Sequence, residues 1–216
     1  GSKIKWIGRR TVQIEGVKSL KSIKYSVMSD RIEAGTFCVA ACLNSGDLII
    51  KNFNPKHINM ELNLLRKTGA IIKSAKNEIH IKGPKKLRKL NNIITKEYPN
   101  FPTDLQAQFM VLLCKAAGKS TITESIFENR FMHVAELRRL GARIMINKNK
   151  ATIEGVTNFQ GAELMSSDLR ASAALVLAAT VASGKSIINR IYHLDRGYEK
   201  IEKKLKKVGV NIKRIS

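Results

Sequence analysis

The sequence predicts an α/β domain that is built from three copies of one β-α-β-α-β-β unit. Each copy begins with Ser-Asp or Thr-Asp, at Ser29, Thr103 and Ser167, and continues as an apolar helix rich in small residues. A second, amphipathic helix follows in each copy, and both helices end at a glycine. These glycines form the pairs Gly46 and Gly69, Gly118 and Gly141, and Gly184 and Gly209. The spacing within a pair is 23, 23 and 25 residues, and such a recurring register indicates one architecture made from a copied unit.

Composition limits the class of protein. Of the 216 residues, 44% are hydrophobic, which is enough for a real core. There are 39 Lys and Arg against 17 Asp and Glu, so the formal net charge is +22 and the chain favours anionic partners: nucleic acid, membrane or phosphorylated small molecules. No run approaches the roughly 20 apolar residues of a membrane span, and no signal-peptide pattern opens the chain. We therefore expect a cytoplasmic protein without a membrane partner.

We place unit one at about residues 18–83, unit two at 98–155 and unit three at 161–216, together one domain over 18–216. Residues 1–2, Gly-Ser, are set aside as an expression scar. Residues 3–17, KIKWIGRRTVQIEGV, match the hairpin that ends unit two, ARIMINKNKATIEGV, but no helices precede them. We therefore expect a remnant hairpin and linker of a missing domain, in a chain cut from a longer protein.

The elements of units one and two follow the same order. After the first helix, the β-branched stretches LIIKNF and TITESI predict strands, and HINMELNLLRKTGA and RFMHVAELRRLGA predict amphipathic helices. A strand, a turn and a second strand then end at Gly83 and Gly155. Between the two units the basic stretch GPKKLRKLNNIITKEYPN predicts an extended connection.

Unit three repeats this order but stops early. The stretch SIINRI predicts a strand, RGYEKIEKKLKKVGV a helix and NIKRI a single final strand. The hairpin partner of that strand must come from elsewhere, and our hypothesis is that the missing N-terminal part supplies it. Without that part the edge is open or borrowed.

Several motifs favour structural roles over functional ones. Gly-Lys-Ser occurs at Gly118 and Gly184, but a phosphate-binding loop needs a glycine where Leu113 and Ala179 stand. Aromatic residues make up only 6% of the chain, so no nucleic-acid partner is expected beyond incidental phosphate contacts of the Lys-rich stretches. Metal-ligand spacing is absent among the cysteines and histidines, so we expect buried free thiols and no metal. These residues are Cys38, Cys42, Cys114, His57, His80, His133 and His193.

The aspartates at the unit starts fit helix caps. Asp30 with Glu33, and Thr103 with Gln106, have the spacing of capping boxes, in which side-chain oxygens bond to free helix amides. Asp104 differs from the others because Phe101 and Pro102 precede it and glutamines follow on the next turn. A cap needs none of these, so Asp104 is also a candidate for handling a proton.

Three arginines are candidates for an anion site. Arg130 and Arg196 each lie 12 residues after a unit glycine, Gly118 or Gly184, and we expect them at the heads of the second helices. Arg170 lies in the first turn of its helix. If the units pack around a common axis, helix amides and arginines converge on one end and bind an anion. The alternative is that these arginines form surface ion pairs.

The segments FPTDLQAQF, ENRFMHVAELRRLGA, SSDLRASAALVLAA and IYHLDRGYEKIE closely resemble the UDP-N-acetylglucosamine 1-carboxyvinyltransferase family of enolpyruvyl transferases. The resemblance runs from about residue 4 to residue 216. It implies a two-domain transferase in which each domain is an inside-out α/β barrel of three units. This chain would supply one domain, and the missing N-terminal domain would be its partner.

The resemblance also implies a reaction of peptidoglycan synthesis. The 3′-hydroxyl of UDP-N-acetylglucosamine adds to carbon 2 of phosphoenolpyruvate, carbon 3 is protonated, and phosphate leaves. No cofactor is implied. Asp104 would be the base on the sugar hydroxyl, and the backbone of Ile126, beside Phe127, would hold the UDP-sugar.

By the same resemblance Arg196 would bind the phosphate or carboxylate of phosphoenolpyruvate, and Arg130 and Arg170 would complete a cationic wall. Asp168 would assist proton handling or hold an arginine. Other family residues that grip phosphoenolpyruvate lie in the missing domain, so this chain alone should be inactive. Two alternatives are the sister enzyme that acts on shikimate 3-phosphate, which lacks similarity in FPTD and ENRFMH, and a basic nucleic-acid-binding module.

Overall fold

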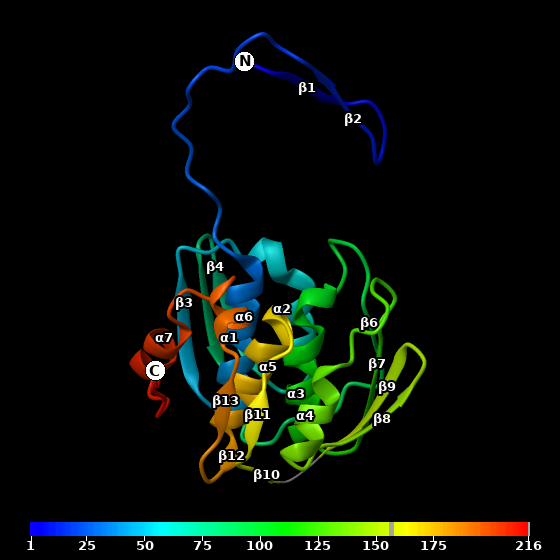
Figure 1. Cartoon of the computed structure of the whole chain (residues 1–216), viewed down its shortest axis with the longest axis vertical. Helices are drawn as coiled ribbons and strands as arrows, with labels where there is room; N and C mark the ends of the chain where they lie inside the picture. The colour runs from blue at the N-terminus through cyan, green and yellow to red at the C-terminus, as the bar shows by residue number, and fades with distance from the viewer. Residues whose placement is uncertain (156–157, 216) are drawn as a thin grey trace.

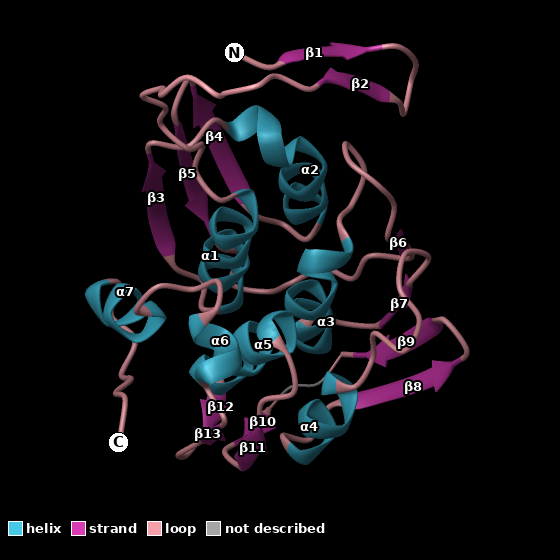
Figure 2. Cartoon of the chain, turned by 45° about the horizontal axis from the view of Figure 1, so that its top comes forward, coloured by secondary structure: helices cyan, strands magenta, loops and turns pink. Residues whose placement is uncertain are grey.

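Three helices form the centre of the computed structural model, which describes residues 1–155 and 158–215 (Figure 1). They are α1 (Arg31–Leu43), α3 (Gln106–Lys115) and α5 (Leu169–Thr180), one from each unit, and α3 packs against both of the others. Strands lie outside them: β3 and β4 on one side, β7 to β9 on the opposite side and β10 to β13 below (Figures 1 and 2). Helices are therefore inside and sheets outside, as the inside-out α/β barrel prediction requires.

The central helices are buried because they are apolar on every side. Residues 38–43 of α1, 106–114 of α3 and 171–178 of α5 are all buried, and a helix that is hydrophobic all round belongs in a core. Small side chains allow the backbones to approach closely. A methyl group on Gly35 of α1 would lie 2.5 Å from a Cδ atom of Leu105. Cys38, Cys42 and Cys114 are buried free thiols within this core, which confirms that prediction, and burial raises the pKa of Cys114 to about 12.

Unit one continues outward from α1 as a three-stranded antiparallel sheet of order β3-β5-β4. Its remaining elements are β3 (Asp47–Lys51), η1 (Pro55–Ile58), α2 (Asn59–Lys67), β4 (Ile71–Ala75) and β5 (Glu78–Lys82). The strand and hairpin expected after the first helix are thus both present. Residues 16–30, which precede α1, form no strand and are all exposed.

Unit two has the complete β-α-β-α-β-β order, in a four-stranded sheet arranged β6-β7-β9-β8. Its elements are β6 (Ile93–Ile94), η2 (Thr103–Leu105), α3, β7 (Lys119–Thr123), α4 (His133–Arg139), β8 (Arg143–Asn147) and β9 (Lys150–Glu154). The parallel pair β6 and β7 brings the basic connection against the end of β7, with Ile94 opposite Thr123. This pairing places the segment that leads to Asp104 beside the loop that follows β7.

Unit three has two parallel strand pairs, β10 with β12 and β11 with β13. Its elements are β10 (Phe159–Gln160), β11 (Glu163–Met165), α5, β12 (Ala182–Ser183), β13 (Ile187–Asn189), α6 (Tyr192–Asp195) and α7 (Ile201–Lys207). The final strand predicted for residues 211–215 does not form, and these residues are mostly exposed. A strand needs a hydrogen-bonded neighbour, and none of the described strands pairs with this segment.

An antiparallel hairpin stands apart from the helical centre at the start of the chain (Figure 1). It consists of β1 (Lys3–Trp6) and β2 (Val12–Glu15), with Lys3 opposite Glu15. Every residue of both strands is exposed, including Trp6. Among all the described residues, no helix has the length and the apolar character that crossing a membrane would require.

Glycine stops account for the helix ends at three of the six predicted positions, since Gly69, Gly141 and Gly209 directly follow the C-caps of α2, α4 and α7. Gly118 and Gly184 lie beyond the ends of α3 and α5, which stop at Lys115 and Thr180, so those two predictions are wrong. Gly69, Gly118, Gly141, Gly184 and Gly209 have φ between +85° and +108°, a conformation that favours glycine. Gly46 does not have a positive φ. Ser45, one residue earlier, takes the left-handed conformation with φ of 49°, so that predicted stop is wrong by one residue.

We predict that Gly155→Ala strongly destabilises the fold. The added Cβ would lie 1.7 Å from the carbonyl oxygen of Ala116, and a backbone atom cannot move aside as a flexible side chain can. We expect the free energy of unfolding to fall by at least about 2 kcal/mol, measured by urea denaturation. Gly46→Ala is the matched control, because its Cβ would meet only ordinary contacts at 3.7 Å. Equal stability of the two variants would contradict the prediction.

Candidate active site

Asp104 lies in η2, the short 3-10 helix that leads into α3, and it does not cap a helix. The residue before η2 is Pro102, and neither η2 nor α3 has a side-chain cap bond. The capping box predicted for Thr103 and Gln106 is also absent, because Thr103 Oγ1 donates to Glu124 Oε2 at 2.9 Å. Only the proton-handling part of the hypothesis for Asp104 therefore remains.

Two arginines from different units hold the Asp104 carboxylate. Arg130 Nη2 donates to Oδ1 at 3.1 Å, and Arg170 Nη2 donates to Oδ2 at 2.9 Å. We call these three residues the clamp. The Asp104 side chain is 37% exposed to solvent, and the Arg170 side chain is 16% exposed. The carboxylate can therefore be reached from solvent although both of its oxygens are oriented by guanidinium groups.

Two of the three arginines, Arg130 and Arg170, converge as the anion-site hypothesis expected, but on a carboxylate of the chain itself. Arg170 Nη1 is buried and has no hydrogen-bond partner among the described residues. Arg130 is the more exposed of the two, and the Phe127 ring lies 5.1 Å from its guanidinium carbon. The clamp can thus offer cationic donors to an anion next to Asp104.

Asp168 caps α5 through the backbone of its first turn. Its Oδ1 accepts from the backbone nitrogens of Arg170 at 2.8 Å and Ala171 at 2.9 Å. Asp30 is the corresponding cap of α1 and accepts from Ile32 at 2.7 Å. The cap interpretation is therefore confirmed for both aspartates, although Glu33 bonds to Lys204 instead of closing a capping box.

Arg196 does not lie at the head of the second helix of unit three, so that prediction is wrong. It is the exposed C-cap of the four-residue helix α6, and α7 begins only at Ile201. Lys200, in the left-handed conformation with φ of 46°, separates the two helices. In the same way Arg130 precedes α4, which begins at His133. Arg130 therefore reaches the clamp from a loop, whereas Arg170 reaches it from the first turn of α5.

Glu124 is a buried carboxylate that the sequence analysis missed. Its Oε1 accepts from Thr95 Oγ1 at 2.7 Å and from the backbone nitrogens of Ile126 and Phe127 at 2.9 and 3.2 Å. Its Oε2 accepts from Thr103, the neighbour of Asp104. One buried carboxylate thus joins the basic connection, η2 and the loop after β7.

The alternation of β7 contained a signal for Glu124. Ser120 and Ile122 are buried in β7, and Glu124 is the next position of the same parity. An acidic residue at an inward position needs several hydrogen-bond donors around it. The backbone N–H of Ile126 donates to Glu124. A ligand at this residue can therefore bond only to the carbonyl oxygen of Ile126.

His133, the first residue of α4, is a second buried group that had no predicted role. It is 2% exposed, and its Nε2 has no hydrogen-bond partner among the described residues. Burial lowers the pKa of His133 to about 4, opposed by the charge of Asp168 and aided by that of Arg130. A neutral imidazole therefore lies beside two residues of the candidate site.

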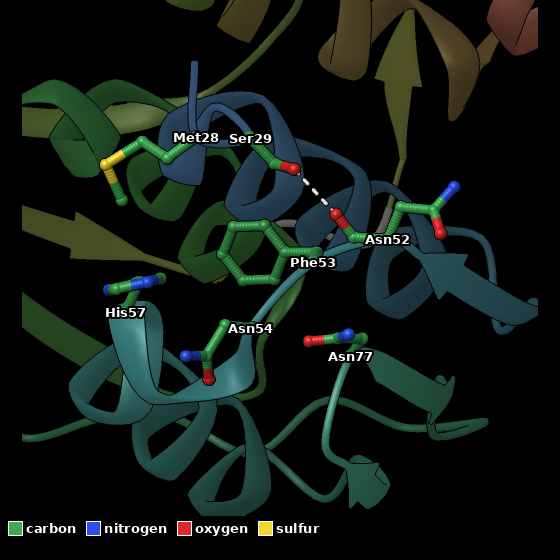
Figure 3. A pocket seen from close by; sticks show the side chains of 7 residues that line it. All are labelled: Met28, Ser29, Asn52, Phe53, Asn54, His57 and Asn77. Carbon is green, nitrogen blue, oxygen red and sulfur yellow. Dashed lines mark hydrogen bonds between the residues drawn. The ribbon is translucent and has the colours of Figure 1, made fainter. Parts of the chain in front are cut away.

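A pocket in unit one lies away from the clamp (Figure 3). It has a volume of about 290 Å³ and includes Asn52, Asn54 and His57. The position 12 residues after the unit glycine, which holds Arg130 and Arg196 in the other units, is the buried Ile58 here. Unit one therefore has a buried apolar residue in place of the arginine. Within the described residues, no cluster of three or more side chains is suited to hold a metal ion.

The chain matches one protein-family model and several curated proteins that share one name. A family model described as EPSP synthase (3-phosphoshikimate 1-carboxyvinyltransferase) matches residues 1–205. Proteins named UDP-N-acetylglucosamine 1-carboxyvinyltransferase match 100% of the chain, at 63% identity in Pelagibacter ubique and 50% in Bartonella quintana. The match covers 52% and 51% of those two proteins, so the chain spans about half the length of the curated relatives it matches.

Solved structures confirm the predicted fold class. The enolpyruvyl transferase NikO from Streptomyces tendae has a TM-score of 0.86 at 27% identity, over 99% of this chain and 51% of that one. EPSP synthase from Acinetobacter baumannii has a TM-score of 0.75 at 20% identity, over 100% of this chain and 53% of that one. The second likeness shows the fold alone.

We predict that Glu124→Gln lowers the free energy of unfolding by about 1–3 kcal/mol, because an amide replaces one acceptor oxygen by a donor within a ring of donors. Urea denaturation measures this change, and faster proteolysis of residues 93–103 should accompany it. Glu128→Gln, in the same loop but exposed, is the control and should change neither. A Glu124→Gln protein as stable as wild type would show that these bonds contribute little.

We also predict that the stability of the fold falls in acid partly through His133. Because the folded pKa is about 4 and the ordinary value is 6.5, the neutral form is favoured on folding. Its contribution is complete above about pH 6.5 and is lost as the pH falls toward 4, on the order of 3 kcal/mol. His133→Gln should give a flatter stability profile between these pH values. Parallel profiles of the two proteins would contradict this.

Proposed function

The chain belongs to the EPSP synthase family of enolpyruvyl transferases, and from this membership we propose that it forms the Asp104-bearing half of a UDP-N-acetylglucosamine 1-carboxyvinyltransferase. The enolpyruvyl group of phosphoenolpyruvate is transferred to the 3′-hydroxyl of UDP-N-acetylglucosamine, and phosphate is released. This reaction would be the first committed step of peptidoglycan synthesis, in the bacterial cytoplasm.

The observation that carries the proposal is the clamp. The reaction needs a group that accepts the hydroxyl proton and cations that balance the charges of phosphate and carboxylate. Asp104 is a reachable carboxylate, and Arg130 and Arg170 lie within hydrogen-bond distance of it. Each carboxylate oxygen has two lone pairs, so Asp104 can accept a sugar hydroxyl while it keeps both arginines.

The chemistry assigns a role to each remaining residue of the site. The free carbonyl of Ile126 would accept a hydrogen bond from the UDP-sugar, and Phe127 would pack beside it. Arg170, whose Nη1 has no hydrogen-bond partner in the described part of the chain, would bind an anionic oxygen of phosphoenolpyruvate, and the exposed Arg196 would add a second cation. Asp168 would act by orienting Arg170 rather than by moving a proton, since its Oδ1 is already bonded to the helix backbone.

The identities of the relatives favour a UDP-sugar acceptor over shikimate 3-phosphate. Relatives with the UDP-sugar name are 50–63% identical to the chain, whereas EPSP synthase from Acinetobacter baumannii is 20% identical. The other half of the relatives would complete the cleft as a partner domain. We therefore propose that residues 18–216 form one of two domains and that the reaction requires both.

We predict that Asp104→Ala lowers turnover at least about 10²-fold, the low end for loss of a general base. The assay is phosphate release from phosphoenolpyruvate by the intact protein that contains this chain and the half its relatives carry, with and without UDP-N-acetylglucosamine. Asp47→Asn is the control, since Asp47 is an exposed carboxylate paired with His80 outside the site. Its turnover should match wild type.

Release that needs the UDP-sugar and is lost in Asp104→Ala would support the proposal. If shikimate 3-phosphate replaces the UDP-sugar, the acceptor is wrong although the reaction class is right. If a well-folded Asp104→Ala protein stays within a few-fold of wild type, Asp104 is not the base.

A further inference from the structure

Three buried polar side chains, one from each unit, meet near the centre of the fold. Thr36 on α1, Gln108 on α3 and Tyr198 after α6 are between 0 and 1% exposed. The hydroxyl oxygens of Thr36 and Tyr198 are 2.9 Å apart, and Gln108 Nε2 lies 3.2 Å from both. We call these residues the polar triad.

The number of hydrogens on each group determines which atom donates in each of these hydrogen bonds. Thr36 Oγ1 donates its one hydrogen to the carbonyl oxygen of Ile32 at 2.8 Å. Tyr198 must therefore donate to Thr36, while Gln108 donates to both oxygens. Burial raises the pKa of Tyr198, which keeps the phenol protonated as this arrangement requires. The Tyr198 oxygen then remains an acceptor on its outer side.

The clamp arginine lies beside that acceptor. The guanidinium carbon of Arg170 is 5.8 Å from the centroid of the Tyr198 ring. A side-chain hydrogen bond with Arg170 lowers the pKa of Tyr198, against the larger effect of burial, so the guanidinium also lies next to the hydroxyl oxygen. The same guanidinium donates to Asp104 Oδ2 at 2.9 Å. A continuous set of polar contacts therefore runs from α1 through Tyr198 and Arg170 to Asp104.

The repeated fold does not itself demand these polar residues. Met110 and Ala174 stand where Thr36 stands relative to the unit aspartate, and both are buried. Met60 and Met132 stand where Tyr198 stands relative to the unit glycine, and both are exposed. The other units therefore fold with apolar or exposed side chains at the positions equivalent to Thr36 and Tyr198.

The polar triad also has a cost in stability. Gln108 Oε1 is buried without a hydrogen-bond partner among the described residues, and such a group lowers stability relative to an apolar core. The polar triad is therefore neither required by the fold nor favoured by burial. The contact between Tyr198 and Arg170 indicates a role in the candidate site instead.

We propose that Tyr198 is a positioning residue, which holds the Arg170 guanidinium in the orientation that bonds to Asp104 and faces the anionic substrate. The inference rests on the proposed function. Tyr198 acts through Arg170 and needs no contact with a reacting atom. Its removal should therefore affect turnover more than it affects folding.

The test measures UDP-N-acetylglucosamine-dependent phosphate release by the intact protein, together with its melting temperature. In Tyr198→Phe the ring remains and only the hydroxyl is lost. We expect kcat to fall about tenfold, the scale of one hydrogen bond to a charged group, with the KM for the UDP-sugar within about twofold of wild type. Leu205→Ala is the matched control, since Leu205 is a buried apolar member of the same small core cluster as Tyr198. It should lower the melting temperature and leave kcat unchanged where the protein is folded.

A second arm asks whether Tyr198 acts through Arg170. In an Arg170→Lys background, where the forked guanidinium is already gone, Tyr198→Phe should cost less than about twofold in kcat. A tenfold loss retained in that background would overturn the inference, as would a kcat of Tyr198→Phe within twofold of wild type. If wild type itself shows no UDP-sugar-dependent release, the proposed function fails, and the inference fails with it for that separate reason.

Discussion

The mutual burial of three helices constrains everything else in this protein. In most α/β domains a sheet forms the centre and helices cover it. Here α1, α3 and α5 occupy the centre, so each must be apolar on all sides and narrow enough for its neighbours to approach. Alanine, glycine and cysteine meet both conditions. The sheets then cover the helices from outside, and their exposed positions include apolar residues such as Ile49, Ile71 and Met145.

The candidate site arises where the three units stop being equivalent. All begin with Asp, but Asp30 and Asp168 cap their helices while Asp104 does not. The difference follows from Glu124, which takes the Thr103 hydroxyl and fixes the 3-10 turn in place of a capping box. Asp104 is then free to accept from Arg130 and Arg170. A repeated architecture with one altered turn thus yields a single carboxylate between two guanidinium groups.

Buried polar groups near this site are more numerous than a core of this kind needs. Glu124 has four donors, whereas Gln106, Gln108 and His133 each have at least one side-chain atom without a partner among residues 1–155 and 158–215. Unsatisfied groups cost stability, and the apolar centre of α1, α3 and α5 compensates for that cost. Their position around the clamp is consistent with a site whose geometry is held from several directions at once.

The sequence by itself determined the repeat, the central helices, the glycine stops of the three outer helices, and Asp104, Arg130 and Arg170 as candidate site residues. These depend on local patterns: hydrophobic period, turn residues and fixed spacing along the chain. Only the tertiary structure decided that Asp104 bonds to Arg130 and Arg170, that Arg196 ends a short helix, that residues 211–215 form no strand, and that Glu124 and Tyr198 are buried beside the site. The physical reason is that each of these outcomes depends on which partner is nearest in space. A side chain can cap, pair or bond to a loop with similar energy, and the packing of the three units decides among them.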